Sequence, residues 1–286
     1  MNISTGIIIF IAFIPALCWF ILYYQQNKKD PEPLGVLWRT FVWGGIGTTL
    51  LMGIQYICIQ RTGIAIIEWL RIENVPEVGI TFIFALLEES IKGWVLFSLI
   101  LKYRKTTNQF VDGIMLGVSV ALGFSFIENI FYFIQIIHLV SRFDFVITYL
   151  FRTLGTMFAH TLFSGIVGYF IAYGILDAHT HKLIIKKEKG VYFSLKDFII
   201  EIITFHTLFH HILTKYPSTK GHFLFGIFFE SLFLSTVLHF VFNLLLSTNL
   251  YDKNLMFLSV PFLFLIAGIL FKKFKDKQAL KIRQVP

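Results

Sequence analysis

The sequence predicts an all-α fold, a polytopic bundle of about seven transmembrane helices that forms one integral-membrane domain. Two observations lead to this prediction. The 286 residues are 56% hydrophobic and 15% charged, with a mean hydropathy of +0.73, which is typical of a membrane protein rather than of a soluble domain. The apolar residues also fall into stretches of roughly 20, the length that crosses the hydrocarbon core of a bilayer. The single domain is expected to cover residues 1–286.

Polar, basic or proline-containing segments separate the expected spans. The first span, from about residue 5 to 24, is too long and too aromatic for a cleavable signal peptide, so we expect a retained anchor. The others cover about residues 37–59, 81–103, 111–137, 145–176, 222–246 and 255–271. Gly113 and Gly117, in the fourth span, have the GxxxG spacing that lets another helix approach closely.

The distribution of Lys and Arg predicts the orientation of the bundle. With the N-terminus outside, the strongly basic loops and the C-terminal tail all lie on the cytoplasmic side, as the positive-inside rule requires. Residues 177–221 then form a basic cytoplasmic insert, in which residues 195–216 predict an interfacial amphipathic helix. The net charge of +8 therefore predicts contact between these cytoplasmic loops and anionic lipid, and it does not indicate a nucleic-acid partner.

The third expected span contains side chains that are unusual for a membrane. Glu88, Glu89 and Lys92 lie near its middle, where an ionisable group costs about 2.5–3.5 kcal/mol on insertion scales. Glu88 and Lys92 are four residues apart and can pair on one helix face, whereas Glu89 points about 100° away from Glu88. Such groups indicate a functional site, and the alternative is a buried ion pair that fixes helix packing.

Three further spans carry polar side chains at a similar depth. Glu128 and Asn129 lie in the fourth span, His160 in the middle of the fifth, and His239 with Asn243 in the sixth. At a rise of about 1.5 Å per residue, these groups lie at the bilayer centre or slightly outward of it. Unrelated polar residues would scatter in depth, so the convergence predicts one shared site.

The residue types at this depth favour metal-dependent hydrolysis. Imidazole and carboxylate are zinc ligands, and three protein ligands plus a water describe a catalytic zinc. Glu128, His160 and His239 supply such a set. Asn243, one turn after His239, is either a fourth ligand or a group that orients the water.

The remaining charged groups are candidates for proton transfer. Glu88 and Glu89 are available to take a proton from an activated water and return it to a leaving amine, and Lys92 supplies a positive charge that pairs with one of them. Arg152 and Glu230 lie nearer the ends of their spans, where long side chains reach the interface, and we place neither in the site.

The polar segments match, in order, the motifs of one family. Residues 88–92 read EESIK, residues 124–132 read FSFIENIFY, residues 239–243 read HFVFN, and His160 follows an upstream arginine. They resemble the EExxK, FxxxENxxY, HxxxD/N and histidine-containing third motifs of the PrsW family of intramembrane metalloproteases. The resemblance covers about residues 25–247 and includes the DPEPLG turn after the first span.

The resemblance implies a multi-pass enzyme of the cell membrane that cleaves a membrane-embedded protein substrate with the help of zinc. In the best-known case the substrate is a single-span anti-sigma factor, and the cut is a first one on the outer side. The family is grouped with CAAX-type and ABI membrane peptidases, which typically carry a histidine in the second motif, where this chain has Glu128.

We therefore expect a zinc-dependent endopeptidase with a catalytic core over about residues 79–247. Glu89 is the expected general base, with Glu88 assisting. Two other functional classes remain as alternatives. The same Glu, His and Lys residues are also suited to a proton relay in an ion- or proton-coupled transporter, although no inverted repeat is evident. In a non-catalytic membrane partner protein they would hold helices together.

Overall fold

The described part of the chain is helical apart from short turns and helix ends, and it contains no strand. The structure, a computed structural model, describes residues 4–26, 32–62, 76–103, 109–180, 220–248, 259, 261–265 and 267–268. Its elements are α1 (Thr5–Gln26), α2 (Leu34–Thr62), α4 (Glu77–Lys102), α5 (Phe110–Ile136), α6 (Arg142–Leu150), the π-helix η1 (Phe151–Thr156), α7 (Met157–Thr180) and α10 (Lys220–Thr248). The expected interfacial helix at 195–216 lies outside the described residues.

The helical membrane-protein fold that the sequence predicts is confirmed. Four described segments are long and apolar enough to cross a membrane, namely α1, α5, the continuous run Arg142–Ile175 and Gly226–Leu246 of α10. Helices α2 and α4 have 29 and 26 residues but are not among these four. The expected number of about seven spans and the orientation of the termini stay predictions.

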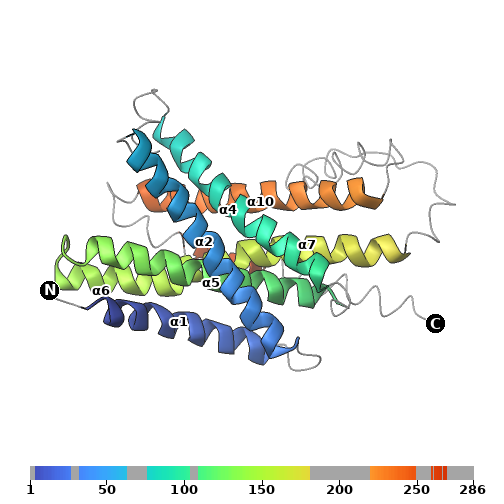
Figure 1. Ribbon diagram of the computed structural model, residues 1–286, viewed down its shortest axis with the longest axis horizontal. Coiled ribbons are helices and arrows are strands. Elements are labelled where there is room, and N and C mark those ends of the chain that lie inside the picture. Colours follow the sequence, from blue (N-terminus) through green and yellow to red (C-terminus); the bar gives the residue numbers. More distant parts are fainter. Residues whose placement is uncertain are drawn as a thin grey trace.

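Helix α5 lies at the centre of the bundle. It packs most extensively against α7 and α2 and also contacts α1 and α4, while α10 packs on α7 and α4. In Figure 1 the axes of α1, α5, α7 and α10 are nearly parallel or antiparallel. Helices α2 and α4 lie side by side and cross them at an angle. Helices α4 and α7 contact each other, and both contact α5 and α10. These four helices carry all of the side chains that the sequence predicts for the site.

Backbone contact holds α5 against its two main neighbours. A Cβ placed on Gly117 would lie 2.2 Å from the carbonyl oxygen of Ser164 in α7, and Gly113 meets α7 in the same way. A Cβ on Gly123 would lie 1.8 Å from the carbonyl oxygen of Phe41 in α2. No side chain larger than that of glycine fits at such distances. The close approach predicted at Gly113 and Gly117 is confirmed, and Gly123 provides a second one.

We expect Gly123→Ala to destabilise the bundle, because its methyl group would overlap a carbonyl oxygen of α2. Overpacking of this kind costs about 1–3 kcal/mol, which should appear as a lower midpoint of thermal unfolding in detergent. Gly53→Ala in α2 is the matched control, since a Cβ there meets nothing within 4 Å, and its midpoint should be unchanged or slightly raised. Equal midpoints for the Gly123→Ala variant and the wild type would contradict the described packing.

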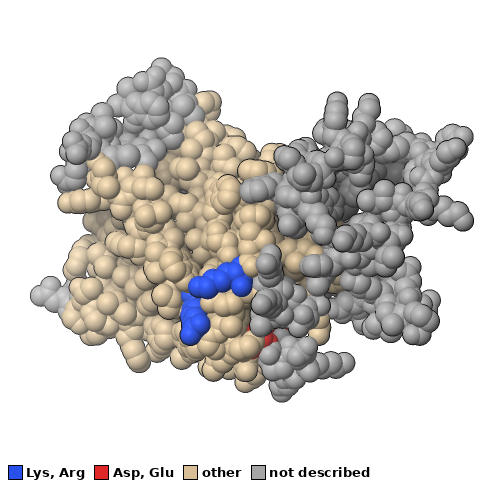
Figure 2. All heavy atoms as spheres, turned by 45° about the vertical axis from the view of Figure 1, so that its right-hand side comes forward, with Lys and Arg blue, Asp and Glu red and all other residues tan. Residues whose placement is uncertain are grey.

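The surface of the described residues suits a lipid environment. Large apolar side chains on the outside of α1 and α2, such as Phe10, Leu50 and Ile57, are each more than half exposed. Soluble monomers rarely expose extended apolar patches. On the face shown in Figure 2 the described surface is almost entirely uncharged, and its Lys and Arg side chains are gathered in one place. Both features agree with a multi-pass membrane protein.

Candidate metal centre

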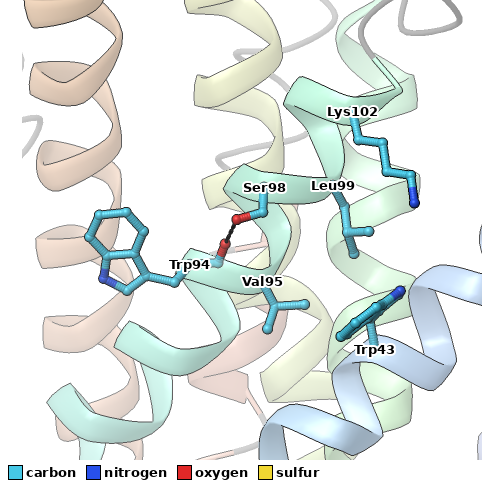
Figure 3. A pocket seen from close by; sticks show the side chains of 6 residues that line it. All are labelled: Trp43, Trp94, Val95, Ser98, Leu99 and Lys102. Carbon is cyan, nitrogen blue, oxygen red and sulfur yellow. Dashed lines mark hydrogen bonds between the residues drawn. The ribbon is translucent and has the colours of Figure 1, made fainter.

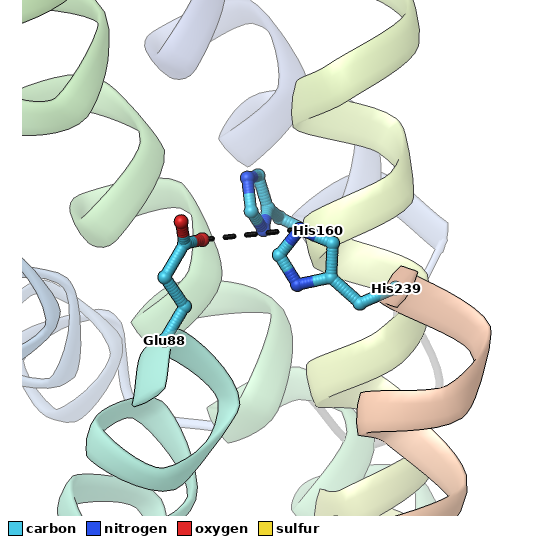
Figure 4. Close-up of side chains that lie close together, drawn as sticks. All are labelled: Glu88, His160 and His239. Carbon is cyan, nitrogen blue, oxygen red and sulfur yellow. Dashed lines mark ion pairs between the residues drawn. The ribbon is translucent and has the colours of Figure 1, made fainter. Parts of the chain in front are cut away.

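Three side chains from three helices converge in the interior of the bundle. Glu88 lies on α4, His160 on α7 and His239 on α10, and one ligand atom of each lies within 4.8 Å of the other two. Figure 4 shows the carboxylate directed toward the two imidazole rings, with Glu88 Oε2 3.8 Å from His239 Nε2. The two rings meet edge to face, with their centroids 5.0 Å apart. Both histidines are buried, while Glu88 keeps 17% of its side chain exposed.

Glu89 orients His239. The Nδ1 atom of His239 lies 2.8 Å from Glu89 Oε1, and Ser235, one turn earlier on α10, donates a hydrogen bond to Glu89 Oε2 at 2.5 Å. Because Nδ1 is held by this carboxylate, Nε2 is the nitrogen that faces Glu88. A carboxylate that binds the far nitrogen of a ligating histidine is a common support of metal sites, since it fixes both the ring and its tautomer.

Lys92 forms the buried partner of Glu89. Its ammonium group contacts Glu89 Oε1, lies 2.8 Å from His160 Nδ1, and faces the Phe124 ring at 4.8 Å from the centroid. Lys92 and Glu89 are each only 1% exposed, so the two charges depend on each other. The sequence suggested a pair between Lys92 and Glu88. The structure instead pairs Lys92 with Glu89, because residues three apart are also helix neighbours.

Glu128 lies beside the same cluster and is held by Arg152. Glu128 Oε2 is 3.2 Å from His160 Nε2, and Glu128 Oε1 is 2.8 Å from Nη2 of Arg152. Arg152 Nε also donates a hydrogen bond to Asn129 Oδ1 at 2.7 Å, and its guanidinium group lies 4.1 Å from the centroid of the Tyr132 ring. One arginine thus contacts three residues of the ENxxY segment.

Two side chains at the site were not predicted from the sequence. Arg152 was expected to reach the membrane interface, but it is 14% exposed and turned inward toward a carboxylate. The only indication of Ser235 in the sequence is weak: it lies four residues before His239, and so on the same helix face. Among the described residues, Asn243 forms no hydrogen bond with the side chains of the cluster, although it lies one turn after His239.

A separate pocket of about 350 Å³ lies between α2 and α4 (Figure 3), and none of the charged residues described above lines it. Its lining residues are Trp43, Trp94, Val95, Ser98, Leu99 and Lys102. The Ser98 hydroxyl donates a hydrogen bond to the Trp94 carbonyl of its own helix at 2.9 Å. The lining has one hydroxyl, which is hydrogen-bonded to the backbone, and one lysine, but no carboxylate or imidazole. The candidate site is therefore the cluster around the two histidines.

The donor atoms of this cluster fit a divalent metal. Imidazole nitrogens and carboxylate oxygens are the ligands of catalytic zinc sites outside the thiolate class. Glu88 Oε2 is buried and accepts no hydrogen bond from the described residues, and an unpaired carboxylate oxygen inside a protein is costly. A cation held by the two imidazoles beside this oxygen would compensate that cost through its positive charge.

Comparison with known proteins points to one family. The family model described as PrsW family intramembrane metalloprotease matches residues 32–187, just over half of the chain. The chain is similar to Protease PrsW of Oceanobacillus iheyensis, with 29% identity over 206 residues, 71% of this chain and 81% of the relative. It is 31% identical to Protease PrsW of Bacillus subtilis over 173 residues, 59% of this chain and 66% of the relative.

A third relative, Protease PrsW of Geobacillus kaustophilus, is 28% identical over 156 residues, which cover 54% of this chain and 61% of the relative. No solved structure matches the chain. The residues matched by the family model include Glu88, Glu128 and His160, whereas α1 and His239 lie outside them.

Proposed function

The chain belongs to the PrsW family of intramembrane metalloproteases, and we propose that it is a zinc-dependent endopeptidase that hydrolyses membrane-tethered proteins. The observation that carries the proposal is the convergence of Glu88, His160 and His239 from three helices, with ligand atoms within 4.8 Å of one another. A catalytic zinc site needs three protein ligands and one position left open to water or substrate. Glu128 lies beside this group, with Oε2 3.2 Å from His160 Nε2, so the four side chains supply three ligands and one further carboxylate for proton transfer.

We propose His160, His239 and Glu128 as the metal ligands and Glu88 as the general base. Arg152 holds Glu128 from the side opposite His160, and a ligating carboxylate is normally fixed by a hydrogen bond of this kind. Glu88 Oε2 and Glu128 Oε2 both accept no hydrogen bond from the described residues. Glu128 is paired with Arg152 through its other oxygen, whereas Glu88 has no ion pair with an arginine there and stays able to take a proton. Asn243 stays in the proposal as a fourth ligand or as a group that orients water.

Glu89 receives a different role from the one expected from the sequence. Its two carboxylate oxygens are occupied by Lys92, His239 and Ser235, so its contacts favour the orientation of His239 over proton transfer. Lys92 balances the charge of Glu89 at a depth where an unpaired carboxylate would be very costly.

The proposed reaction divides the work between the metal and the chain. His160, His239 and Glu128 would hold the zinc, which would supply Lewis acidity to activate water and polarise the scissile carbonyl. Glu88 accepts the proton from the attacking water and delivers it to the leaving amine. Glu89 and Arg152 keep His239 and Glu128 in place, so that the geometry is preserved during turnover.

Cleavage of a single-span substrate by the purified protein tests the proposal. We expect cleavage in liposomes to stop when a strong chelator is added and to return with Zn²⁺. The control is Glu230→Gln in α10. Glu230 lies outside the cluster and is buried, at 9% exposed, instead of reaching the interface as the sequence suggested. This variant should cleave like the wild type. Cleavage that survives both chelation and Glu88→Gln would reject the metalloprotease function.

Exchanging the two glutamates for glutamine separates their roles. We expect Glu88→Gln to keep its zinc while kcat falls by about 100-fold or more, the usual contribution of a general base. We expect Glu128→Gln to lose zinc, because a neutral amide is a poor ligand. Zinc content by atomic absorption beside kcat decides between the assignments, and loss of zinc from Glu88→Gln alone would make Glu88 the ligand.

The proposed substrate is a protein with a single membrane span, such as an anti-sigma-factor-like protein, cut first near the outer side of the membrane. The resemblance of the motifs and the position of the site within apolar helices support this class of substrate. Mass spectrometry of the cleaved products would locate the cut, and a cut in a soluble domain far from the span would contradict it.

A further inference from the structure

Helix α1 lies outside residues 32–187, which the family model matches, yet it forms hydrogen bonds on both sides of His160 in the sequence. The indole Nε1 of Trp19 donates a hydrogen bond to the carbonyl oxygen of Thr153 in η1 at 2.8 Å. The hydroxyl of Tyr23 is hydrogen-bonded to Thr161 Oγ1, also at 2.8 Å. Thr161 is the residue directly after His160.

Aromatic contacts extend this interface. The Trp19 ring stacks on Phe158 and on Tyr23, with centroid distances of 5.6 and 5.8 Å. Nearer the start of α1, the Tyr149 hydroxyl donates a hydrogen bond to the carbonyl oxygen of Ile11 at 3.2 Å. The contact positions increase together along both segments, so α1 runs parallel to the segment from α6 to α7.

The segment that α1 contacts contains an uncommon backbone conformation. The N–H of Met157 donates to the carbonyl oxygen of Arg152, five residues earlier, as in a π-helix. A π-turn adds one residue to the helical path and so turns the residues before it by about 100° relative to an unbroken α-helix. Such turns are rare and often mark functional sites. Thr153, whose carbonyl Trp19 binds, is buried inside this turn.

The π-turn in turn directs Arg152 toward the metal centre. Arg152 Nη2 is 2.8 Å from Glu128 Oε1, and Glu128 Oε2 is 3.2 Å from His160 Nε2. Contacts therefore run without a break from Trp19 through Thr153, Arg152 and Glu128 to His160. Simple anchoring of α1 needs only apolar packing, which Ile8, Ala12, Ala16 and Phe20 provide through their buried side chains. The indole hydrogen bond into the π-turn is additional to that packing.

We propose that α1 is a positioning element of the metal centre, in which Trp19 holds the π-turn in the register that directs Arg152 at Glu128. This inference rests on the proposed function, in which Glu128 is a metal ligand. Trp19 acts through Arg152 and does not touch the reacting groups. Loss of the Trp19 indole N–H changes the placement of Glu128, and with it the zinc affinity and kcat. The apolar packing of α1 against the bundle is kept.

Trp19→Phe tests the inference, because it removes the indole N–H and retains an apolar ring. We expect a fall in zinc affinity, or in kcat at saturating zinc, of about 10-fold or more, the lower end of the range for the loss of a group that supports a ligand. KM and the thermal midpoint should stay close to the wild-type values. Trp43→Phe is the matched control, since Trp43 is 46% exposed on α2, and it should show wild-type zinc affinity and kcat.

A double-mutant cycle with Arg152→Gln decides whether Trp19 acts through Arg152. If it does, Trp19→Phe has no further effect on zinc affinity in the Arg152→Gln background, whereas independent effects multiply. Wild-type zinc affinity and kcat in Trp19→Phe, or multiplying effects in the cycle, would overturn the inference. A wild-type protein that binds zinc but cleaves no substrate would count against the proposed function alone, because zinc affinity still tests the role of α1.

Discussion

His239→Ala should deprive the centre of its metal and abolish cleavage. His239 is the one cluster residue that is fixed by Glu89 at Nδ1 and faces Glu88 with Nε2, so no other side chain replaces it. Losing a group that only supports a ligand costs about 10–100-fold in affinity or activity, and the loss of a ligand should exceed this. We expect the purified variant to contain little zinc and kcat/KM to fall by more than about 100-fold.

The control for this prediction is His138→Ala. His138 is an exposed histidine in the turn after α5, and its variant should match the wild type in zinc content and cleavage. Zinc analysis of the wild type and both variants, purified in parallel, gives the comparison. Wild-type zinc content in His239→Ala would show that His239 is not a ligand. It would thereby contradict the proposed ligand set of His160, His239 and Glu128.

Lys92→Met should be among the most destabilising substitutions in the chain. Lys92 and Glu89 are each 1% exposed and in direct contact, and removing one member of a buried pair costs about 3–5 kcal/mol because the other charge is left unpaired. Unfolding by a denaturing detergent, followed by circular dichroism, measures this loss. Cleavage should be lost as well, because Lys92 contacts both Glu89 and His160 Nδ1 at the centre.

Two further variants separate charge pairing from simple packing. Lys102→Met makes the same exchange at an exposed position near the end of α4 and should leave stability nearly unchanged. Adding Glu89→Gln to Lys92→Met removes the unpaired charge, so part of the lost stability should return while cleavage stays low. Equal losses for Lys92→Met and Lys102→Met would contradict the importance of the buried pair.

The sequence predicted which helices carry the site but not how each helix is turned. The shared depth of Glu88, His160 and His239 follows from their positions in apolar segments, and the structure brings the three together. The partner of Lys92 was not predictable in the same way. Residues three and four apart both face a given helix position, so only the rotation of α4 against α7 and α10 decides that Glu89 receives Lys92.

The role of Arg152 depends on a feature with no sequence signature. Residues 151–156 read FRTLGT, and nothing in these letters indicates a π-turn. The sequence suggested the interface for Arg152 because the residue lies near the end of a span. An uninterrupted α-helix would also turn Arg152 by about 100° from its position in the structure. The hydrogen bonds made with this turn come from α1 and α5, which lie far away in the sequence.

The glycine contacts of α5 limit where the bundle can make room for a peptide. The backbones of Phe41 in α2 and Ser164 in α7 contact the backbone of α5 directly. No side chain lies between these backbones that could change rotamer, so α5 cannot move away from α2 or α7 without breaking this packing. The seam between α4 and α10 is different, because it is filled by ring pairs such as Phe82 with Phe240 and Trp94 with Phe228, at 5.5 and 5.0 Å. Side chains of this kind reorient far faster than packed helices separate. Of these two contacts, the aromatic seam is therefore the one that side-chain rotation alone can loosen, and Glu88 and His239 lie on the same two helices.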